Sequence, residues 1–167
     1  MAELQGLFYK NIIGGMLSAT LVFPEYKKLV DGMKDEEWYD WDKFCTMTRE
    51  VGEKVTPQVM VTLGKKVASG AKELFASQGL DSTEKILKNL NTLFLGAVRN
   101  APKWQRFDTE SYENGKAVCI TTVPQPISLI EGYLRGYVSM YGSYVKNVVI
   151  EEVKGQKYTT YKLTITW

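Results

Sequence analysis

The hydrophobic period of the chain changes near Pro102, and this change constrains the possible folds more than any other feature. Before Pro102, apolar residues recur at helical steps of three and four, as in Met60, Leu63 and Val67. After it, apolar and polar side chains alternate, most regularly over residues 161–167, which is typical of strands with one buried face. Helices followed by antiparallel strands predict an α+β fold.

The second half of the chain is expected to contain two hairpins separated by a helix. Asn114-Gly115 lies between two runs rich in β-branched and aromatic residues, which is a strong hairpin signal, and Lys154-Gly155 marks a second hairpin. The expected strands are 104–111, 116–123, 145–153 and 157–167, with a helix over 127–141. We therefore expect N-terminal helices packed on a four-stranded antiparallel sheet, with a strand-strand-helix-strand-strand C-terminal half.

The first 100 residues are expected to be mainly helical. Asp40 and Thr56-Pro57 are typical of helix starts, and Asp81 with Glu84 resembles a capping box. Residues 1–23 leave two alternatives: a bent helix with a stripe that includes Leu17, or a short strand leading into a second segment. The expected helices cover 25–33, 40–55, 57–79 and 81–100. We expect a single α+β domain over 1–167, with a helical part at about 1–100 and a sheet-containing part at about 101–167.

The chain contains no histidine. This excludes Ser-His-Asp and Cys-His catalysis, histidine-rich metal sites and the commonest haem ligand, although haem ligation by Tyr, Cys or Met stays open. Neither a GxGxxG nor a Walker sequence occurs, so nothing indicates a phosphate-binding loop. We therefore expect a protein that is not an enzyme, with no histidine-ligated haem or metal and an otherwise unknown cofactor.

The net charge and the cysteine content narrow the possible binding partners and the expected cellular compartment. The net charge is only +2 and the four arginines are scattered, which argues against nucleic-acid binding. Cys45 and Cys119 lack any CxxC spacing, and two buried, reduced thiols are the simplest interpretation, with a disulfide left open. The start of the chain lacks a secretory signal, and polar residues and glycines interrupt residues 7–23. The sequence predicts a cytoplasmic protein with no membrane span.

One predicted helix combines small and aromatic residues in an unusual way. Gly132 and Gly136 lie four residues apart and would weaken a helix, so a close approach to a neighbour is expected. One interpretation is tight helix–sheet packing. The other is a pocket wall, with Tyr133, Tyr137 and Tyr141 around it and Arg135 as an anchor. The predicted ligand-binding residues are Gly132, Tyr133, Arg135, Gly136, Tyr137, Tyr141, Trp41, Phe94 and Cys119.

Several segments resemble one known superfamily. The resemblance lies mainly in Pro126–Gly136 and Val148–Gly155, and also in residues 38–41, 56–57 and 63–65. These segments are similar to the superfamily that includes 4-vinyl reductase-like domains, haem–nitric-oxide-binding-like domains and TRAPP vesicle-tethering subunits. The resemblance implies helices on an antiparallel sheet, frequent dimerisation and a cavity for a hydrophobic ligand or cofactor. A haem-binding member would be expected to have a proximal histidine and a Tyr-x-Ser-x-Arg motif, and this chain has neither. It also lacks cysteines over residues 154–167, where many 4-vinyl reductase-like domains carry them.

Two functions are consistent with these features. The first is a non-enzymatic small-molecule-binding or sensory domain for signalling, with an apolar pocket between the helices and the sheet. The second is a homodimeric protein–protein interaction or scaffold module without a ligand, in which Trp38, Tyr39, Trp41 and Trp104 supply interface anchors. The expected partners are thus a small hydrophobic molecule, a second copy of the chain or another protein.

Overall fold

A computed structural model describes residues 1–16 and 18–167 and has the expected α+β class. Leu17, part of the predicted N-terminal stripe, lies outside the described residues. The elements in chain order are β1 (Glu3–Gln5), α1 (Gly6–Gly14), α2 (Ala19–Val22), α3 (Pro24–Asp31), β2 (Trp38–Asp40), α4 (Trp41–Lys54), α5 (Pro57–Gly70), α6 (Lys72–Ser77), α7 (Thr83–Lys88), α8 (Leu90–Ala97), β3 (Val98–Arg99), β4 (Phe107–Glu113), β5 (Lys116–Thr121), α9 (Ile127–Ser139), β6 (Asn147–Glu152) and β7 (Tyr161–Thr166).

The C-terminal half forms the predicted four-stranded antiparallel sheet, in the order β4-β5-β7-β6. The β4–β5 turn is made by Asn114-Gly115, where Gly115 has a φ of +87°, a conformation that glycine adopts without strain. Helix α9 connects β5 to β6, which lies at the edge of the sheet, and β7 lies between them and pairs with β5, with Cys119 opposite Leu163. The strand-strand-helix-strand-strand order is confirmed.

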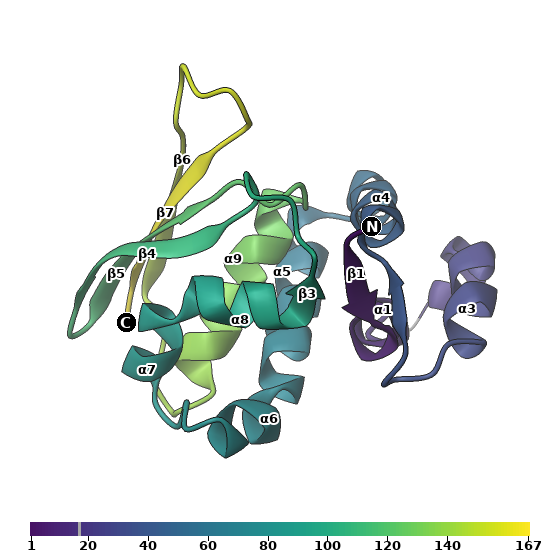
Figure 1. Cartoon of the computed structure of the whole chain (residues 1–167), viewed down its shortest axis with the longest axis horizontal. Coiled ribbons are helices and arrows are strands. Elements are labelled where there is room, and N and C mark those ends of the chain that lie inside the picture. Colours follow the sequence, from purple (N-terminus) through teal and green to yellow (C-terminus); the bar gives the residue numbers. More distant parts are fainter. Residues whose placement is uncertain (17) are drawn as a thin grey trace.

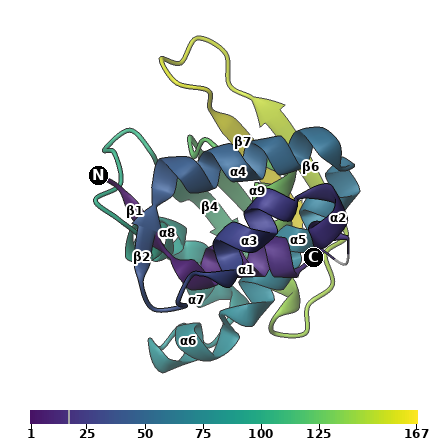
Figure 2. The ribbon, with the colours of Figure 1, turned by 90° about the vertical axis from the view of Figure 1, so that its right-hand side faces the viewer.

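The molecule is built in layers, which Figure 1 shows from the sheet on the left to α3 on the right. Helices α7, α8 and α9 contact strands of the four-stranded sheet, and α5 packs along α9. The N-terminal elements α1, α3 and α4 form the layer farthest from the sheet, and they lie in front in Figure 2. The N-terminal layer is therefore separated from the sheet by a middle layer of helices.

The N-terminal layer is joined to α8 by a small sheet that the sequence did not predict. Strand β1 lies between β2 and β3, with Glu3 opposite both Asp40 and Arg99. The Arg99 guanidinium also pairs with the Glu3 carboxylate at 2.7 Å. Of the two alternatives for residues 1–23, a short strand leading into helices is the observed one.

Two predicted helices are each divided in two. The helix expected over 57–79 breaks at Ala71 into α5 and α6, and the one expected over 81–100 breaks at Asn89 into α7 and α8. The helix expected over 81–100 starts one residue later than predicted. Ser82 rather than Asp81 is its N-cap and accepts a hydrogen bond from the Lys85 N–H. Among the described residues, no helix has the length and apolar character needed to cross a membrane.

Candidate functional site

An apolar cavity of about 420 Å³ lies where the N-terminal layer meets α8 and α9. Its walls come from β1, α1 and α4 on one side, from α5, α6 and α8 on others, and from α9 with the segment before it. The lining residues are Leu4, Gln5, Phe8, Trp41, Phe44, Val67, Leu74, Phe75, Gln78, Leu80, Asn89, Leu90, Thr92, Leu93, Phe94, Gly96, Ala97, Val98, Phe107, Val123, Gln125, Ile130, Tyr133 and Tyr137. Most of the walls are therefore helical, with the four-stranded sheet contributing chiefly Phe107.

The deep wall on the N-terminal side is a fixed aromatic cluster. Asp40 caps α4 by accepting hydrogen bonds from two backbone N–H groups of its first turn, and this cap places Trp41 at the first helical position. The Trp41 indole N–H donates to the Gln105 side-chain oxygen at 2.8 Å, and both residues are buried. Its ring stacks on Phe44 at 5.6 Å and meets Phe94 edge-on at 6.0 Å. These contacts hold the cluster in one arrangement.

Two tyrosines of α9 supply hydroxyl groups to the opposite wall. The Tyr133 hydroxyl accepts a hydrogen bond from the Gln125 side-chain amide at 3.3 Å. The Tyr137 hydroxyl has no hydrogen-bond partner among the described residues, and its ring meets Phe75 edge-on at 5.8 Å. Burial raises the pKa of both phenols far above the ordinary value of 10.0, so both stay protonated at neutral pH.

The cavity wall carries no charged side chain among the residues that the structure describes. Its remaining polar groups are uncharged, and two of them, Gln78 and Thr92, are exposed. The Asn89 side-chain amide, partly buried at the start of α8, already donates to the Lys85 carbonyl at 2.7 Å. A ligand in this cavity would contact apolar surface and a few neutral hydrogen-bonding groups.

Four of the nine predicted ligand-binding residues line this cavity: Trp41, Phe94, Tyr133 and Tyr137. The two predicted glycines do not, because they face α5 rather than the cavity. A methyl group on Gly132 would lie 2.4 Å from the Val61 carbonyl oxygen, and one on Gly136 would lie 2.5 Å from Ala68. The close approach that the sequence predicted is therefore between two helices, not between a helix and the sheet.

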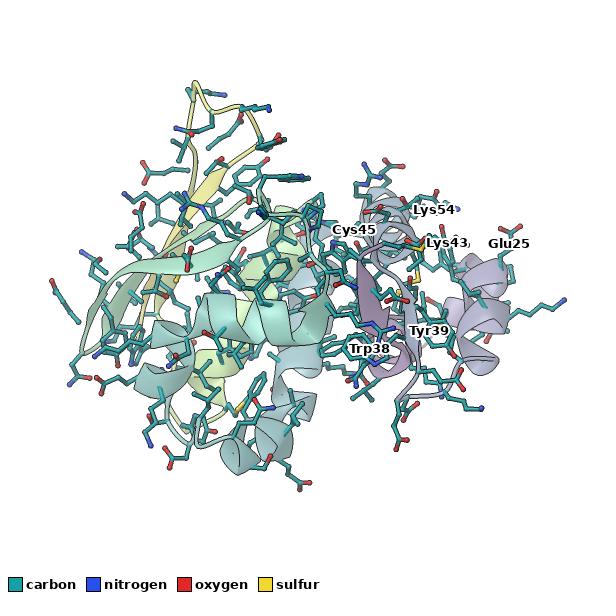
Figure 3. All side chains as sticks on the ribbon, viewed as in Figure 1. Glu25, Trp38, Tyr39, Lys43, Cys45 and Lys54 are labelled. Atoms are coloured by element: carbon teal, nitrogen blue, oxygen red, sulfur yellow. The ribbon has the colours of Figure 1, made fainter. Side chains whose placement is uncertain are left out.

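The other three predicted residues have their own partners away from the cavity. The Arg135 guanidinium pairs with Glu131 one turn earlier on α9 at 2.7 Å, and the Tyr141 hydroxyl donates to the Leu80 carbonyl at 2.7 Å. Cys119 is fully buried on β5 beside Thr109, and burial raises the pKa of its thiol to about 12. Cys45, labelled on α4 in Figure 3, is a second buried free thiol. Neither thiol is activated as a nucleophile.

The lining residues that the sequence did not single out come mainly from β1, α1 and the segment before α9. Phe8 belongs to the predicted N-terminal apolar stripe, but nothing in that stripe indicates which element it faces. Gln125 lies between Pro124 and Pro126, and prolines in these positions are typical of the end of a strand and the start of a helix rather than of a cavity wall. Their place in the wall depends on contacts between segments that are remote in the sequence.

A second hollow lies on the other side of Gln125, towards the long β6–β7 loop. It is bounded by Arg49, Lys157 and a pair of stacked rings, Trp104 and Tyr158, whose centroids are 4.3 Å apart. Trp104 thus stacks on Tyr158, while Trp38, labelled with Tyr39 on β2 in Figure 3, lies under the Arg99 guanidinium at 4.4 Å. Trp41 is buried in the aromatic cluster and Tyr39 meets Tyr9 edge-on, so all four predicted interface anchors have contacts within the chain.

The chain has the same fold as solved H-NOX proteins, which belong to the haem–nitric-oxide-binding class, over almost its whole length. An H-NOX protein from S. oneidensis is 12% identical, with a TM-score of 0.69 over 98% of this chain and 95% of that one. H-NOX from K. algicida is 9% identical at a TM-score of 0.69, and H-NOX from T. tengcongensis is 15% identical at 0.67; each match covers 98% of this chain and 97% of the other.

No family model matches the sequence, and no curated protein matches it either. The haem–nitric-oxide-binding-like part of the predicted resemblance is therefore confirmed for the fold alone. Similarity to 4-vinyl reductase-like domains and to TRAPP subunits stays a prediction.

The residues present do not fit a haem, the group that this fold family implies. One matching H-NOX structure is described as probing haem distortion, and haem iron in proteins is held by His, Cys, Met or Tyr. Among the described residues, no His, Cys or Met lines the cavity, which leaves Tyr133 and Tyr137 as the lining groups of a type that can hold haem iron. The described part of the wall also lacks any Lys or Arg to pair with the two haem carboxylates.

Proposed function

We propose that this chain is a non-enzymatic, cytoplasmic sensory domain that binds a small hydrophobic molecule other than haem in the cavity between its N-terminal layer and α8 and α9. The single observation that carries the proposal is an uncharged cavity of about 420 Å³, walled mainly by aromatic and aliphatic side chains, inside the H-NOX fold. Ligand sites commonly have this volume and this apolar lining with a few polar groups.

The position of the cavity supports a sensory role. Its walls include Trp41 of the N-terminal layer, Phe94 of the middle layer and Phe107 of the sheet. A ligand between them would contact all three layers at once, so its binding would favour one arrangement of the layers over others. This is how a bound molecule can be converted into a change at the protein surface.

The proposal is tested by binding of the neutral dye Nile red, followed by its fluorescence, together with native mass spectrometry of the freshly purified protein. The variant Ala97→Phe places a larger side chain in the cavity wall, and we expect it to weaken dye binding at least tenfold, on the order of the loss of one well-packed apolar contact. Ala76→Phe on the exposed face of α6 is the matched control. Equal binding by both variants would contradict the proposal.

A second proposed function, as a homodimer or protein-docking module, is favoured by exposed apolar side chains in the N-terminal layer. Leu21 of α2 is 86% exposed, and Leu29 of α3 is 45% exposed. Sedimentation of wild type and of Leu21→Ser with Leu29→Ser at increasing concentration tests it. We expect the wild type to associate and the double variant to remain monomeric; a wild-type protein that stays monomeric at high concentration would sink this function.

A further inference from the structure

The two tyrosines in the cavity wall differ in their hydrogen bonding. Tyr133 accepts from the Gln125 amide, which leaves its own O–H proton free to donate. Tyr137 neither donates nor accepts within the described part of the chain. Both tyrosines are half-buried and their phenols are protonated, and neither hydroxyl proton has an acceptor among the described residues, so the wall presents two hydrogen-bond donors that a bound molecule can reach.

A donor that lines a cavity without a protein acceptor can form a hydrogen bond to a bound molecule that provides one, and an apolar group placed against it would leave the donor unpaired. The other polar groups are less suited to this role. The Asn89 amide is already engaged by the Lys85 carbonyl, and Gln78 and Thr92 lie exposed. The phenols of α9 are therefore two of the donors that a bound ligand would meet, and the half-buried Gln5 amide on the opposite wall is a third.

The charge of the wall decides the class of acceptor. A carboxylate, phosphate or sulfonate would lose its hydration in the cavity, and no Lys or Arg of the described wall would compensate that loss. A carbonyl oxygen of a ketone, quinone, aldehyde or amide has a much smaller desolvation penalty and accepts a phenol hydrogen bond well.

We infer that the cavity selects uncharged molecules with an apolar body and a carbonyl-type acceptor, and that Tyr137, assisted by Tyr133, donates the hydrogen bond that orients them. This inference rests on the proposed function, because it names the ligand class of the same cavity. Tyr137 is a specificity-determining residue in this account, and the aromatic cluster around Trp41 accommodates the apolar body.

A matched set of fluorescent naphthalene dyes tests the acceptor. Prodan carries a neutral ketone on a dimethylaminonaphthalene body; its propyl analogue lacks the carbonyl oxygen, and its carboxylate analogue carries a charge instead. We expect wild-type protein to bind Prodan, to bind the propyl analogue about 2- to 10-fold more weakly, as for one lost hydrogen bond, and to show no saturable binding of the carboxylate.

The variant Tyr137→Phe removes the donor and keeps the ring. It should weaken Prodan binding by about 2- to 10-fold, leave binding of the propyl analogue unchanged, and shift the emission of bound Prodan to the blue because its carbonyl loses a hydrogen bond. Tyr141→Phe is the matched control, since the Tyr141 hydroxyl bonds to the Leu80 carbonyl and does not line the cavity. Its Prodan affinity and emission should equal those of wild type.

Three outcomes would overturn the inference, and they are distinguishable from failure of the proposed function. Equal affinity for Prodan and its propyl analogue, or an unchanged emission in Tyr137→Phe, would show that the phenol does not select a carbonyl while an apolar site still exists. Saturable binding of the carboxylate analogue would show that charge is not excluded. Absence of binding by Nile red and by every naphthalene dye would instead reject the cavity as a ligand site, and the inference with it.

Discussion

At the scale of single residues, the contact between α5 and α9 depends on glycines that have no room for a side chain. A methyl group on Gly64 would lie 2.4 Å from the Leu129 carbonyl oxygen and 2.8 Å from the Cα of Gly132. Backbone atoms cannot move aside as a flexible side chain can, so the two helices would have to separate. This contact sets the position of α9 and hence of both cavity phenols.

We predict that Gly132→Ala destabilises the protein by about 1–3 kcal/mol through overpacking, even though alanine is the better helix former. Gly96→Ala in α8 is the control, because nothing lies within 4 Å of its added methyl group, and there a gain of up to about 1 kcal/mol is expected. Urea unfolding of both variants measures the difference. A Gly132→Ala protein as stable as the control would contradict the packing described for the two helices.

At the scale of elements, the start of α4 joins the small sheet to the cavity wall. Asp40 pairs with Glu3 in that sheet and also caps α4, with its carboxylate accepting from the Asp42 and Lys43 N–H groups at 2.8 and 3.1 Å. The next residue is Trp41, the centre of the aromatic cluster. The Asp40 side chain thus fixes both the start of α4 and the position of Trp41 in the cavity wall.

We expect Asp40→Ala to lower the free energy of unfolding by about 1 kcal/mol, the usual effect of losing an N-cap, whereas Asp40→Asn should change it by only a few tenths because asparagine caps about as well. Chemical denaturation followed by circular dichroism makes the comparison. If the two substitutions had equal effects, the charge of Asp40 rather than its capping oxygen would be the stabilising feature.

The elements that could be predicted from sequence are those with local signals. Thr56-Pro57 and Asn114-Gly115 specify a helix start and a turn through their own backbone preferences, and both lie where predicted. The break at Asn89 and the strand β1 have no comparable signal, because β1 forms only by pairing with residues near positions 40 and 98. The candidate site likewise combines features with a local sequence signal and features that depend on contacts between distant segments. The sequence predicted glycines and tyrosines of one helix together in a pocket wall, and only the fold shows that the glycines meet α5 while Tyr133 and Tyr137 line the cavity.

At the scale of the whole molecule, two thiols are buried in separate parts of the core. Cys45 lies in α4 and Cys119 in β5, and both are almost inaccessible. Burial raises the pKa of Cys119 from 9.0 to about 12 and raises the pKa of Cys45 as well. On unfolding, both thiols regain their ordinary pKa, so above about pH 9 the unfolded chain binds fewer protons than the folded one.

The sign of this difference means that stability falls as pH rises from about 9 towards 12, with a slope that approaches about 1.4 kcal/mol per pH unit for each thiol. We predict a shallower slope for the double variant Cys45→Ala with Cys119→Ala between about pH 9 and 10, where the buried phenols contribute equally to the slopes of both proteins. Below about pH 8 the two proteins should show parallel pH profiles, whatever their absolute stabilities. Urea midpoints measured across this pH range test the prediction. Identical slopes at alkaline pH would show that burial does not keep the two thiols protonated.

The cavity also has a consequence for the amount of protein that a cell would keep. A chain that leaves space between its own layers is less stable alone than with that space filled, and any molecule that binds only the folded form adds to its stability by mass action. Proteases remove unfolded protein, so the steady-state level of such a domain rises and falls with the supply of its ligand. The domain would then report its ligand twice, once through its conformation and once through its abundance.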